Sequence, residues 1–184
     1  MTVDTTPLKR GNLFLVGPMG AGKTTVGREL ARHLHLEFQD SDHEIERRTG
    51  VSIPLIFELE GEAGFRAREK AVLAELVQHE HVVLATGGGV VLDPANRAGL
   101  ATHGTVVYLR APVEHLLRRI GRDNHRPLMR TENPRERLEQ LIQERDPLYR
   151  EIADLIIETH RRRTPSVVNE ILRRIQPQPT TVAE

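Results

Sequence analysis

The sequence predicts an α/β protein in which a parallel sheet carries helices on both faces. Two observations support this class: short apolar runs alternate with segments of helical spacing, and glycine-rich stretches follow two of the apolar runs. Parallel strands need a crossover between them, usually a helix, so regular alternation indicates a parallel sheet. At 184 residues, the chain is expected to form a single domain.

The apolar runs place the strands. An uninterrupted run such as Leu13-Phe14-Leu15-Val16 is typical of a strand that is buried on both faces. We expect strands at residues 13–16, 37–39, 82–85, 106–109 and 155–157.

Segments in which apolar residues recur at helical spacing place the helices between these strands. They predict helices at residues 23–35, 41–49, 53–60, 65–79, 94–102, 113–119, 134–144 and 166–175. Ser52 before Ile53-Pro54 suits a helix start, because serine caps free amides and proline fits the first turn. We expect a core at about residues 12–175, with frayed ends at 1–10 and 177–184.

The composition excludes several classes of protein. The 26 basic and 26 acidic residues balance, which argues against bulk attraction to nucleic acid or to a membrane. The chain has no cysteine, so disulfides, thiolate metal sites and cysteine nucleophiles are excluded. No apolar run approaches the ~20 residues of a membrane span, and residues 1–10 lack the apolar segment of a signal peptide. We therefore expect a soluble, cytoplasmic protein.

Residues 17–24, Gly-Pro-Met-Gly-Ala-Gly-Lys-Thr, fit the phosphate-binding P-loop motif G-x-x-x-x-G-K-[ST]. Backbone amides and the N-terminus of the following helix can surround an anion there. We expect Lys23 to reach the β- and γ-phosphates and the Thr24 hydroxyl to ligate Mg²⁺. A glycine-rich turn that matches by chance is the alternative, expected in roughly one chain in a hundred of this length. The nucleotide-binding residues expected in this segment are Gly20, Ala21, Gly22, Lys23, Thr24 and Thr25.

The stretch from Gly121 to Asn133 is polar, nonperiodic and rich in arginine. A loop of this length is typically a functional lid or a disordered segment. Beside a P-loop, a mobile lid excludes water and brings cations to the transferring phosphoryl group. The GTPase motifs N-K-x-D and D-x-x-G and the dinucleotide motif G-x-G-x-x-G are absent. We therefore expect phosphoryl transfer from ATP to a small molecule.

Acidic residues follow the second expected strand, at the carboxyl edge of the sheet where α/β proteins bind ligands. Asp40 is placed to orient Mg²⁺ through water. Asp42 is placed to bind substrate hydroxyls and to take the proton of the attacking one. The alternative is that Ser41 or Asp42 only caps the next helix, a role that is compatible with catalysis.

Gly87, Gly88 and Gly89 follow the third expected strand at the same edge. Their backbone can lie directly against a ligand, although a merely flexible turn is the alternative. Arg66 begins an expected helix, where the helix dipole disfavours a cation. This mild conflict indicates a functional role for Arg66, such as gripping a carboxylate with its planar guanidinium.

Together these residues resemble shikimate kinase over about residues 12–175. The matching pieces are GPMGAGKTT at 17–25, DSDHEIE at 40–46, RRTG at 47–50, FRARE at 65–69, ATGGG at 85–89, RPL at 126–128 and RDPLY at 145–149. The resemblance implies a three-layer P-loop fold of the nucleoside-monophosphate-kinase type, with a five-stranded parallel sheet flanked by helices and a closing lid. It also implies a monomer that phosphorylates the 3-hydroxyl of shikimate with ATP, giving shikimate 3-phosphate and ADP on the route to chorismate and aromatic amino acids.

By position, the resemblance assigns four shikimate contacts. Arg66 and Arg145 look like the ligands of the carboxylate, and Asp42 and the Gly88 backbone look like the ligands of the ring hydroxyls. Shikimate is an anion with three hydroxyls, so a cationic fork at one end and polar acceptors at the other suit it independently.

Two further arginines and one short segment are assigned to ATP. Arg126 looks like the lid arginine that reaches the phosphates, and with Lys23 and Asp42 it completes the expected catalytic set. Arg119 looks like the residue that packs on adenine, with Arg163-Thr164-Pro165 on the other side.

Two features depart from the family pattern. The third expected strand ends at Thr86 instead of a Walker-B aspartate, so metal binding rests on Thr24 with Asp40 in support. In the lid, Arg122 and Arg130 have no matched role beside Arg126. The alternatives are another small-molecule P-loop kinase, of the gluconate or adenylate kinase type, and a nucleotide-binding regulator without catalysis.

Overall fold

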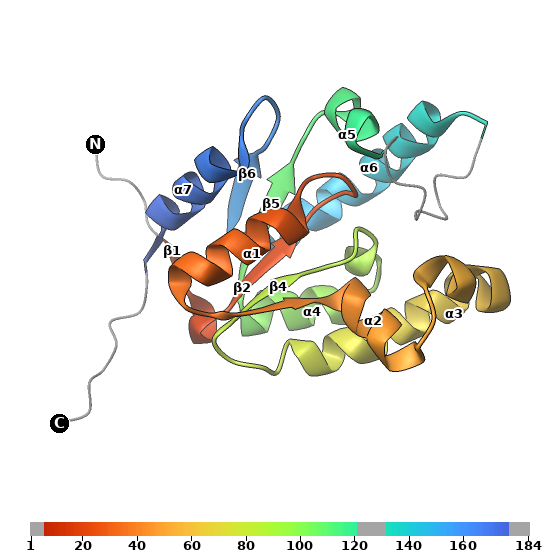
Figure 1. The fold of residues 1–184 in the computed structure, drawn as a ribbon, viewed down its shortest axis with the longest axis horizontal. Helices are drawn as coiled ribbons and strands as arrows, with labels where there is room; N and C mark the ends of the chain where they lie inside the picture. The colour runs from red at the N-terminus through yellow and green to blue at the C-terminus, as the bar shows by residue number, and fades with distance from the viewer. Residues whose placement is uncertain (1–5, 121–131, 177–184) are drawn as a thin grey trace.

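The structure is a computed structural model that describes residues 6–120 and 132–176. Five strands form a parallel sheet in the order β3-β4-β2-β5-β6 (Figure 1). This confirms the predicted five-stranded parallel sheet, and each predicted strand lies within an observed one. The bounds are Leu13–Val16 for β2, Glu37–Asp40 for β3, Val82–Ala85 for β4, Thr105–Arg110 for β5 and Leu155–Glu158 for β6.

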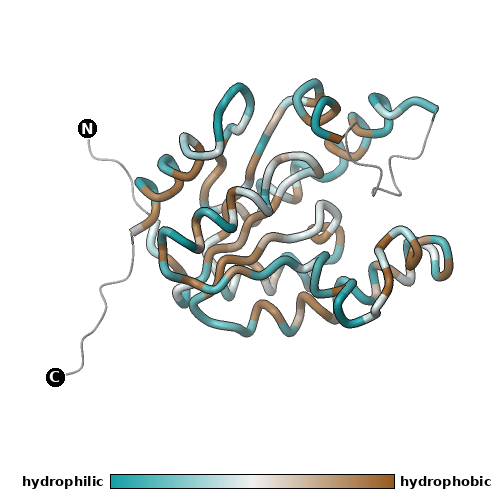
Figure 2. The backbone as a smooth tube through the Cα atoms, viewed as in Figure 1, coloured by the Kyte–Doolittle hydropathy of each residue, from teal (hydrophilic) through white to brown (hydrophobic). Residues whose placement is uncertain are grey.

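Helices cover both faces of the sheet, because successive side chains of a strand point to opposite faces. Leu13 and Leu15 of β2 enter a first hydrophobic cluster, which includes residues of α1 (Lys23–Leu34) and α7 (Thr164–Arg174). Phe14 and Val16 enter a second hydrophobic cluster, which includes residues of α3 (Ile53–Leu76) and α4 (Pro94–His103). Figure 2 shows hydrophobic residues gathered along the central strands between these layers. The three-layer α/β arrangement is therefore confirmed.

Three more helices complete the described fold: α2 (Ser41–Thr49), α5 (Val113–Ile120) and α6 (Pro134–Ile152). The helix predicted at 134–144 ends too early, since α6 continues through Pro147. The loss of one amide at Pro147 is offset by the burial of Tyr149 and Ile152 in the second cluster. Helix α6 therefore carries residues 145–149 on a regular scaffold.

The helices predicted at 53–60 and 65–79 form one element, α3, with a break at Gly61. Gly61 has φ 70° and ψ −176°, a conformation that is essentially restricted to glycine. The predicted break is present, but helical residues resume before residue 65 and end at Leu76 instead of residue 79. Helix α7 begins at Thr164, two residues before the predicted start at 166, and ends before Ile175 enters a strand.

The expected fraying of residues 1–10 is wrong for residues 6–10. Strand β1 (Thr6–Pro7) pairs in parallel with β7 (Ile175–Gln176), and a short 3₁₀ helix covers Lys9–Gly11. Leu8 is buried in the first cluster, and the Lys9 ammonium lies 2.8 Å from the Asp154 carboxylate. Backbone pairing and side-chain burial therefore hold this segment. Residues 1–5 and 177–184 lie outside the described residues.

Asn12, which precedes β2, is fully buried at the amino ends of the strands. Its side-chain amide donates to the carbonyl oxygens of His79 and His103, at 2.7 and 2.9 Å. Its side-chain oxygen accepts from the Val82 amide at 3.1 Å. One polar side chain thus connects β2 to the segments that precede β4 and β5.

The predicted lid at residues 121–133 falls almost wholly outside the described residues, which resume at residue 132. Arg122, Arg126 and Arg130 therefore lie outside them as well. Within residues 6–120 and 132–176, no helix is both long and apolar enough to cross a membrane.

Candidate active site

The P-loop connects β2 to α1 at the carboxyl edge of the sheet. Gly20 and Gly22 have φ 79° and 96°, which glycine adopts without a steric penalty. No side chain caps the first turn of α1, so this helix terminus is suited to an anion. The Lys23 ammonium donates to the carbonyl oxygens of Gly17 and Pro18, at 2.7 and 2.8 Å, and so lies folded against its own loop.

Asp40 joins the P-loop to α2. Its carboxylate accepts a hydrogen bond from the Thr24 hydroxyl at 2.8 Å. It also accepts from the amides of Asp42 and His43, at 3.0 and 3.3 Å, and it is therefore the N-cap of α2. The alternative in which Ser41 or Asp42 provides this cap is wrong, because β3 extends to Asp40 and the helix starts one residue later.

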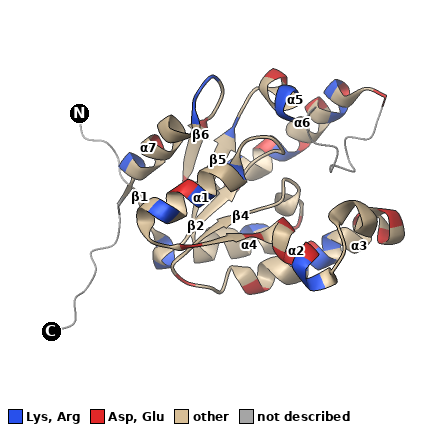
Figure 3. Ribbon diagram, viewed as in Figure 1, with Lys and Arg blue, Asp and Glu red and all other residues tan. Residues whose placement is uncertain are grey.

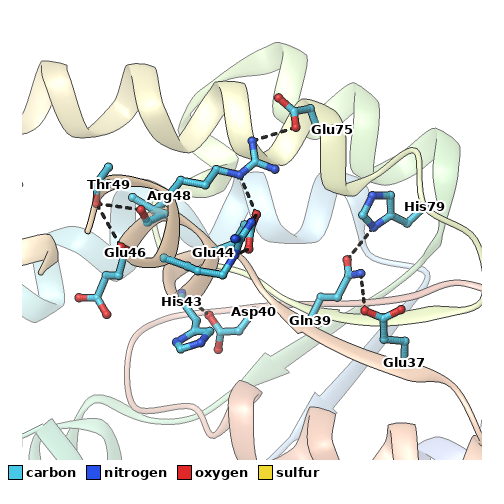
Figure 4. A network of polar contacts seen from close by, with 12 residues as sticks. Glu37, Gln39, Asp40, His43, Glu44, Glu46, Arg48, Thr49, Glu75 and His79 are labelled. Carbon is cyan, nitrogen blue, oxygen red and sulfur yellow. Dashed lines mark hydrogen bonds and ion pairs between the residues drawn. The ribbon is translucent and has the colours of Figure 1, made fainter. Parts of the chain in front are cut away.

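Helix α2 is held in place by a network of charged side chains (Figure 4). Glu44 accepts hydrogen bonds from Arg47 and Arg48, which lower the pKa of its carboxyl to about 2. Arg48 also pairs with Glu75 of α3 at 2.8 Å, and Glu46 accepts from the Ile53 amide at 2.9 Å. These contacts fix α2, and with it Asp42, against α3.

One cavity of about 370 Å³ opens at this edge of the sheet. It is lined on one side by the P-loop and on the other by Asp42 and Gly88. Thr86, which follows β4 in place of a Walker-B aspartate, also lines the cavity. Its hydroxyl donates to the Leu15 carbonyl oxygen at 2.9 Å. The remaining lining residues are Val26, Asp40, Arg119, Thr159, Arg162, Thr164 and Val167.

Charged side chains approach the backbone closely at two positions of the 87–89 segment. A Cβ atom on Gly87 would lie 2.8 Å from an oxygen of Asp42 and 2.8 Å from an oxygen of Glu69. A Cβ atom on Gly89 would lie 2.2 Å from the guanidinium of Arg66. Acidic and basic side chains therefore converge on this backbone, and contact of the segment with a ligand stays a prediction.

Behind the glycines, Arg66, Glu69 and Arg145 form a largely buried charged cluster. Arg66 donates to Glu69 at 2.7 Å and to Glu62 at 3.2 Å. The prediction that Arg66 begins a helix is wrong, because α3 starts at Ile53 and Arg66 lies within it, after the break at Gly61. Burial raises the pKa of the Glu69 carboxyl, although the charges of Arg66 and Arg145 act to lower it. The Nε groups of Arg66 and Arg145 are buried without a hydrogen-bond partner among the described residues. Both arginines thus retain capacity for an anion.

Sequence reasoning missed Glu69 and Tyr149. Glu69 follows Arg66 by three residues on one helix, a spacing that places the two side chains together. Tyr149 follows Arg145 by four residues on α6, and its hydroxyl donates to the Gly88 carbonyl oxygen. Helical spacing from a predicted site arginine was the available signal in both cases.

The far side of the cavity is formed by Arg119 and the connection between β6 and α7. Arg119 donates to the Gly20 carbonyl oxygen at 3.1 Å, so it lies over the P-loop. Figure 3 shows basic residues gathered at the β6–α7 connection. Thr164 lines the cavity, whereas Pro165 lines an adjoining outer hollow with Arg163. The structure therefore brings Arg119 to the P-loop and leaves Pro165 beside the cavity.

Comparisons with known proteins agree with this geometry. The family model described as shikimate kinase matches residues 19–176. A shikimate kinase of Nitrosococcus oceani is 61% identical over 165 residues, which cover 90% of this chain and 87% of the relative. The structure of the Acinetobacter baumannii shikimate kinase in complex with shikimate is 56% identical, with a TM-score of 0.86, over 88% of this chain and 90% of that one. A gluconokinase of Sinorhizobium meliloti shares the fold, with a TM-score of 0.58 at 14% identity over 89% of this chain and 90% of that one.

Proposed function

Because the chain belongs to the shikimate kinase family, we propose that it transfers the γ-phosphoryl group of ATP to the 3-hydroxyl of shikimate. The products are shikimate 3-phosphate and ADP. The family acts in the biosynthesis of aromatic amino acids and consists of phosphotransferases with an alcohol acceptor.

One observation carries the assignment to this site: a single cavity holds the P-loop together with Asp42 and Gly88. Phosphoryl transfer needs the donor phosphate and the acceptor hydroxyl in line within one water-poor space. A cavity that contained the P-loop alone would equally suit nucleotide hydrolysis.

On the donor side, the P-loop amides and the Lys23 ammonium would bind the β- and γ-phosphates. Lys23 now donates to two loop carbonyls, and a phosphate would replace them as its partner. The Thr24 hydroxyl and the Asp40 carboxylate, 2.8 Å apart, are oxygen donors of the kind that Mg²⁺ prefers. We propose that Thr24 ligates Mg²⁺ directly and Asp40 through water. Bound Mg²⁺ would neutralise charge on the phosphates.

On the acceptor side, Arg66 and Arg145 would hold the carboxylate of shikimate, since the Nε group of each guanidinium has no hydrogen-bond partner among the described residues. Asp42 and the Gly88 backbone, which both line the cavity, would hold the ring hydroxyls. Asp42 would position the attacking hydroxyl and take its proton. A loose transition state needs little base catalysis, so positioning is the larger part of this role.

The remaining roles come from the family resemblance. Arg119 and Pro165 would pack on the two faces of adenine, which requires Pro165 to reach the cavity that Thr164 already lines. Arg126, outside the described residues, would bring its charge to the phosphates. We also propose that the chain acts as a single kinase domain and as a cytoplasmic monomer. Sedimentation of the purified protein tests whether it is a monomer.

The activity is tested by measuring ADP release from ATP and Mg²⁺ with shikimate, gluconate or AMP as the acceptor. We expect strong stimulation by shikimate alone. Stimulation by gluconate or AMP would keep the kinase and discard the shikimate site. Nucleotide binding without turnover for any acceptor would favour the non-catalytic regulator.

A further inference from the structure

We propose that Tyr149 is a positioning residue for the acceptor, acting through the backbone of Gly88. This inference rests on the proposed function of the site. Its basis is a hydrogen bond that crosses between two elements: the Tyr149 hydroxyl on α6 donates to the Gly88 carbonyl oxygen. Tyr149 is 1% exposed, so it does not reach the cavity itself.

The glycine segment needs such a restraint, because three successive glycines have wide conformational freedom. Side chains from two helices hold it. The Ser41 hydroxyl of α2 accepts from the Gly87 amide at 3.1 Å, and the Tyr149 hydroxyl donates to the Gly88 carbonyl oxygen. The amide of Gly88 lies between these two restraints in the chain, and Gly88 lines the cavity. Fixing both neighbours fixes the direction of that amide.

Gly88 is also confined from the side of the P-loop. A Cβ atom at Gly88 would lie 3.3 Å from the Met19 nitrogen and 3.6 Å from the Gly17 carbonyl oxygen. The Tyr149 hydroxyl thus holds Gly88 against the loop that binds the donor. Loss of this hydrogen bond frees the Gly88 peptide to rotate, and the acceptor then meets an unordered backbone.

Helix α6 carries both this restraint and Arg145, the proposed ligand of the shikimate carboxylate. Arg145 lies one turn before Tyr149 on the same helix. Burial raises the pKa of the Tyr149 phenol, although the charge of Arg145 and its hydrogen bond to the Tyr149 oxygen act to lower it. The hydroxyl therefore stays a donor at neutral pH and also links Arg145 to the Gly88 carbonyl. One rigid helix therefore sets both Arg145 and the Gly88 peptide.

The chain supplies a matched control in Tyr108, its one other tyrosine. Both tyrosines are 1% exposed, and their rings pack together with centroids 4.9 Å apart. The Tyr108 hydroxyl donates at 2.8 Å to Asp146, which also accepts from Arg150 at 2.6 Å. Each Tyr→Phe change removes one buried hydroxyl and keeps the ring, but only one of them frees Gly88.

The test compares Tyr149→Phe, Tyr108→Phe and the wild-type protein in steady-state assays with ATP and shikimate. We expect Tyr149→Phe to raise KM for shikimate about five- to tenfold, with KM for ATP within about twofold of wild type. We expect Tyr108→Phe to leave both constants within about twofold, although both variants lower Tm. An unchanged KM for shikimate in Tyr149→Phe, or an equal rise in Tyr108→Phe, would overturn the positioning role.

Two further readouts keep the test decisive. Wild-type protein without shikimate-dependent ADP release would overturn the proposed function itself, whereas normal wild-type turnover with an unaffected Tyr149→Phe overturns only the role of Tyr149. If Tyr149→Phe does not fold, Tyr108→Phe leaves Tyr149 as the only phenol in a chain without tryptophan. Shikimate should then shift the near-ultraviolet absorbance of that phenol, and an unchanged spectrum would contradict the proposal.

Discussion

The Thr24 hydroxyl donates to the Asp40 carboxylate at 2.8 Å, which ties the first turn of α1 to the end of β3. The same carboxylate caps α2 through the amides of Asp42 and His43. A single side chain therefore sets the distance between the P-loop and the helix that carries Asp42. Under the proposed function, this relationship would place the donor and acceptor halves of the site in register before either substrate binds.

We expect Asp42→Asn to lower kcat far more than it weakens ATP binding. The amide keeps the shape of the carboxylate but cannot accept a proton or orient the attacking hydroxyl as a charged acceptor. Steady-state kinetics and ATP titration by calorimetry measure the two quantities separately. Equal losses in both would assign Asp42 a structural role in the first turn of α2.

We expect Arg66→Lys to raise KM for shikimate about 10- to 100-fold, because an ammonium cannot replace the planar guanidinium fork. The matched control is Arg68→Lys on the same helix. Arg68 is exposed and pairs with Glu60 at 2.6 Å. The KM for shikimate of Arg68→Lys should therefore stay within about twofold of wild type. An unchanged KM in Arg66→Lys would move the carboxylate site elsewhere.

The strands could be predicted from the sequence because each is a short, mostly apolar run between segments of helical spacing. The pairing of Thr6–Pro7 with Ile175–Gln176 could not, since two-residue strands carry no pattern and join opposite ends of the chain. The continuation of α6 through Pro147 could not be predicted either, because it depends on the tertiary burial of Tyr149 and Ile152, which offsets the helix-breaking proline.

Asn12→Ala is expected to lower the free energy of unfolding by about 2–4 kcal/mol, because two carbonyl oxygens and one amide lose buried partners. The corresponding fall in Tm is roughly 4–12 °C for a chain of this size. Asn169→Ala on the exposed side of α7 is the control and should change Tm little. A change of similar size in both variants would deny Asn12 its role between the strands.

The pairing of Glu44 with Arg47 and Arg48 predicts a pH-dependent contribution to stability. The pKa of its carboxyl is lowered to about 2 by these hydrogen bonds, so the contribution is present above the unfolded pKa of about 4.3 and is lost as pH falls toward 2. We expect Glu44→Gln to lower Tm by about 1–3 °C at neutral pH and progressively less below about pH 4.

Thermal unfolding across this pH range measures the effect. Glu58→Gln is the control, since Glu58 is exposed and outside the ion pairs of the described residues. A Tm difference for Glu44→Gln that stays constant down to about pH 3 would contradict the assigned cause.

In the site, motif and position singled out the P-loop residues, Asp40, Asp42, Arg66, Arg145 and the three glycines as candidates, and their roles stay predictions. Helical spacing could place Tyr149 beside Arg145, but the contact between Tyr149 and Gly88 was not predictable, because it spans 61 residues and leaves no local pattern. Asp40 illustrates a second limit: its capping role depends on where β3 ends, and that boundary is fixed by strand pairing with β4.

The most direct test of the central claim is phosphorus NMR of the product formed from ATP, Mg²⁺ and shikimate. We expect one phosphate ester whose phosphorus couples to the proton on C3 of shikimate, and no ester with Lys23→Met, since that variant lacks the cation facing the transferred phosphate. Inorganic phosphate as the only new phosphorus product, or an ester on another hydroxyl, would contradict the claim that this cavity aligns ATP with the 3-hydroxyl.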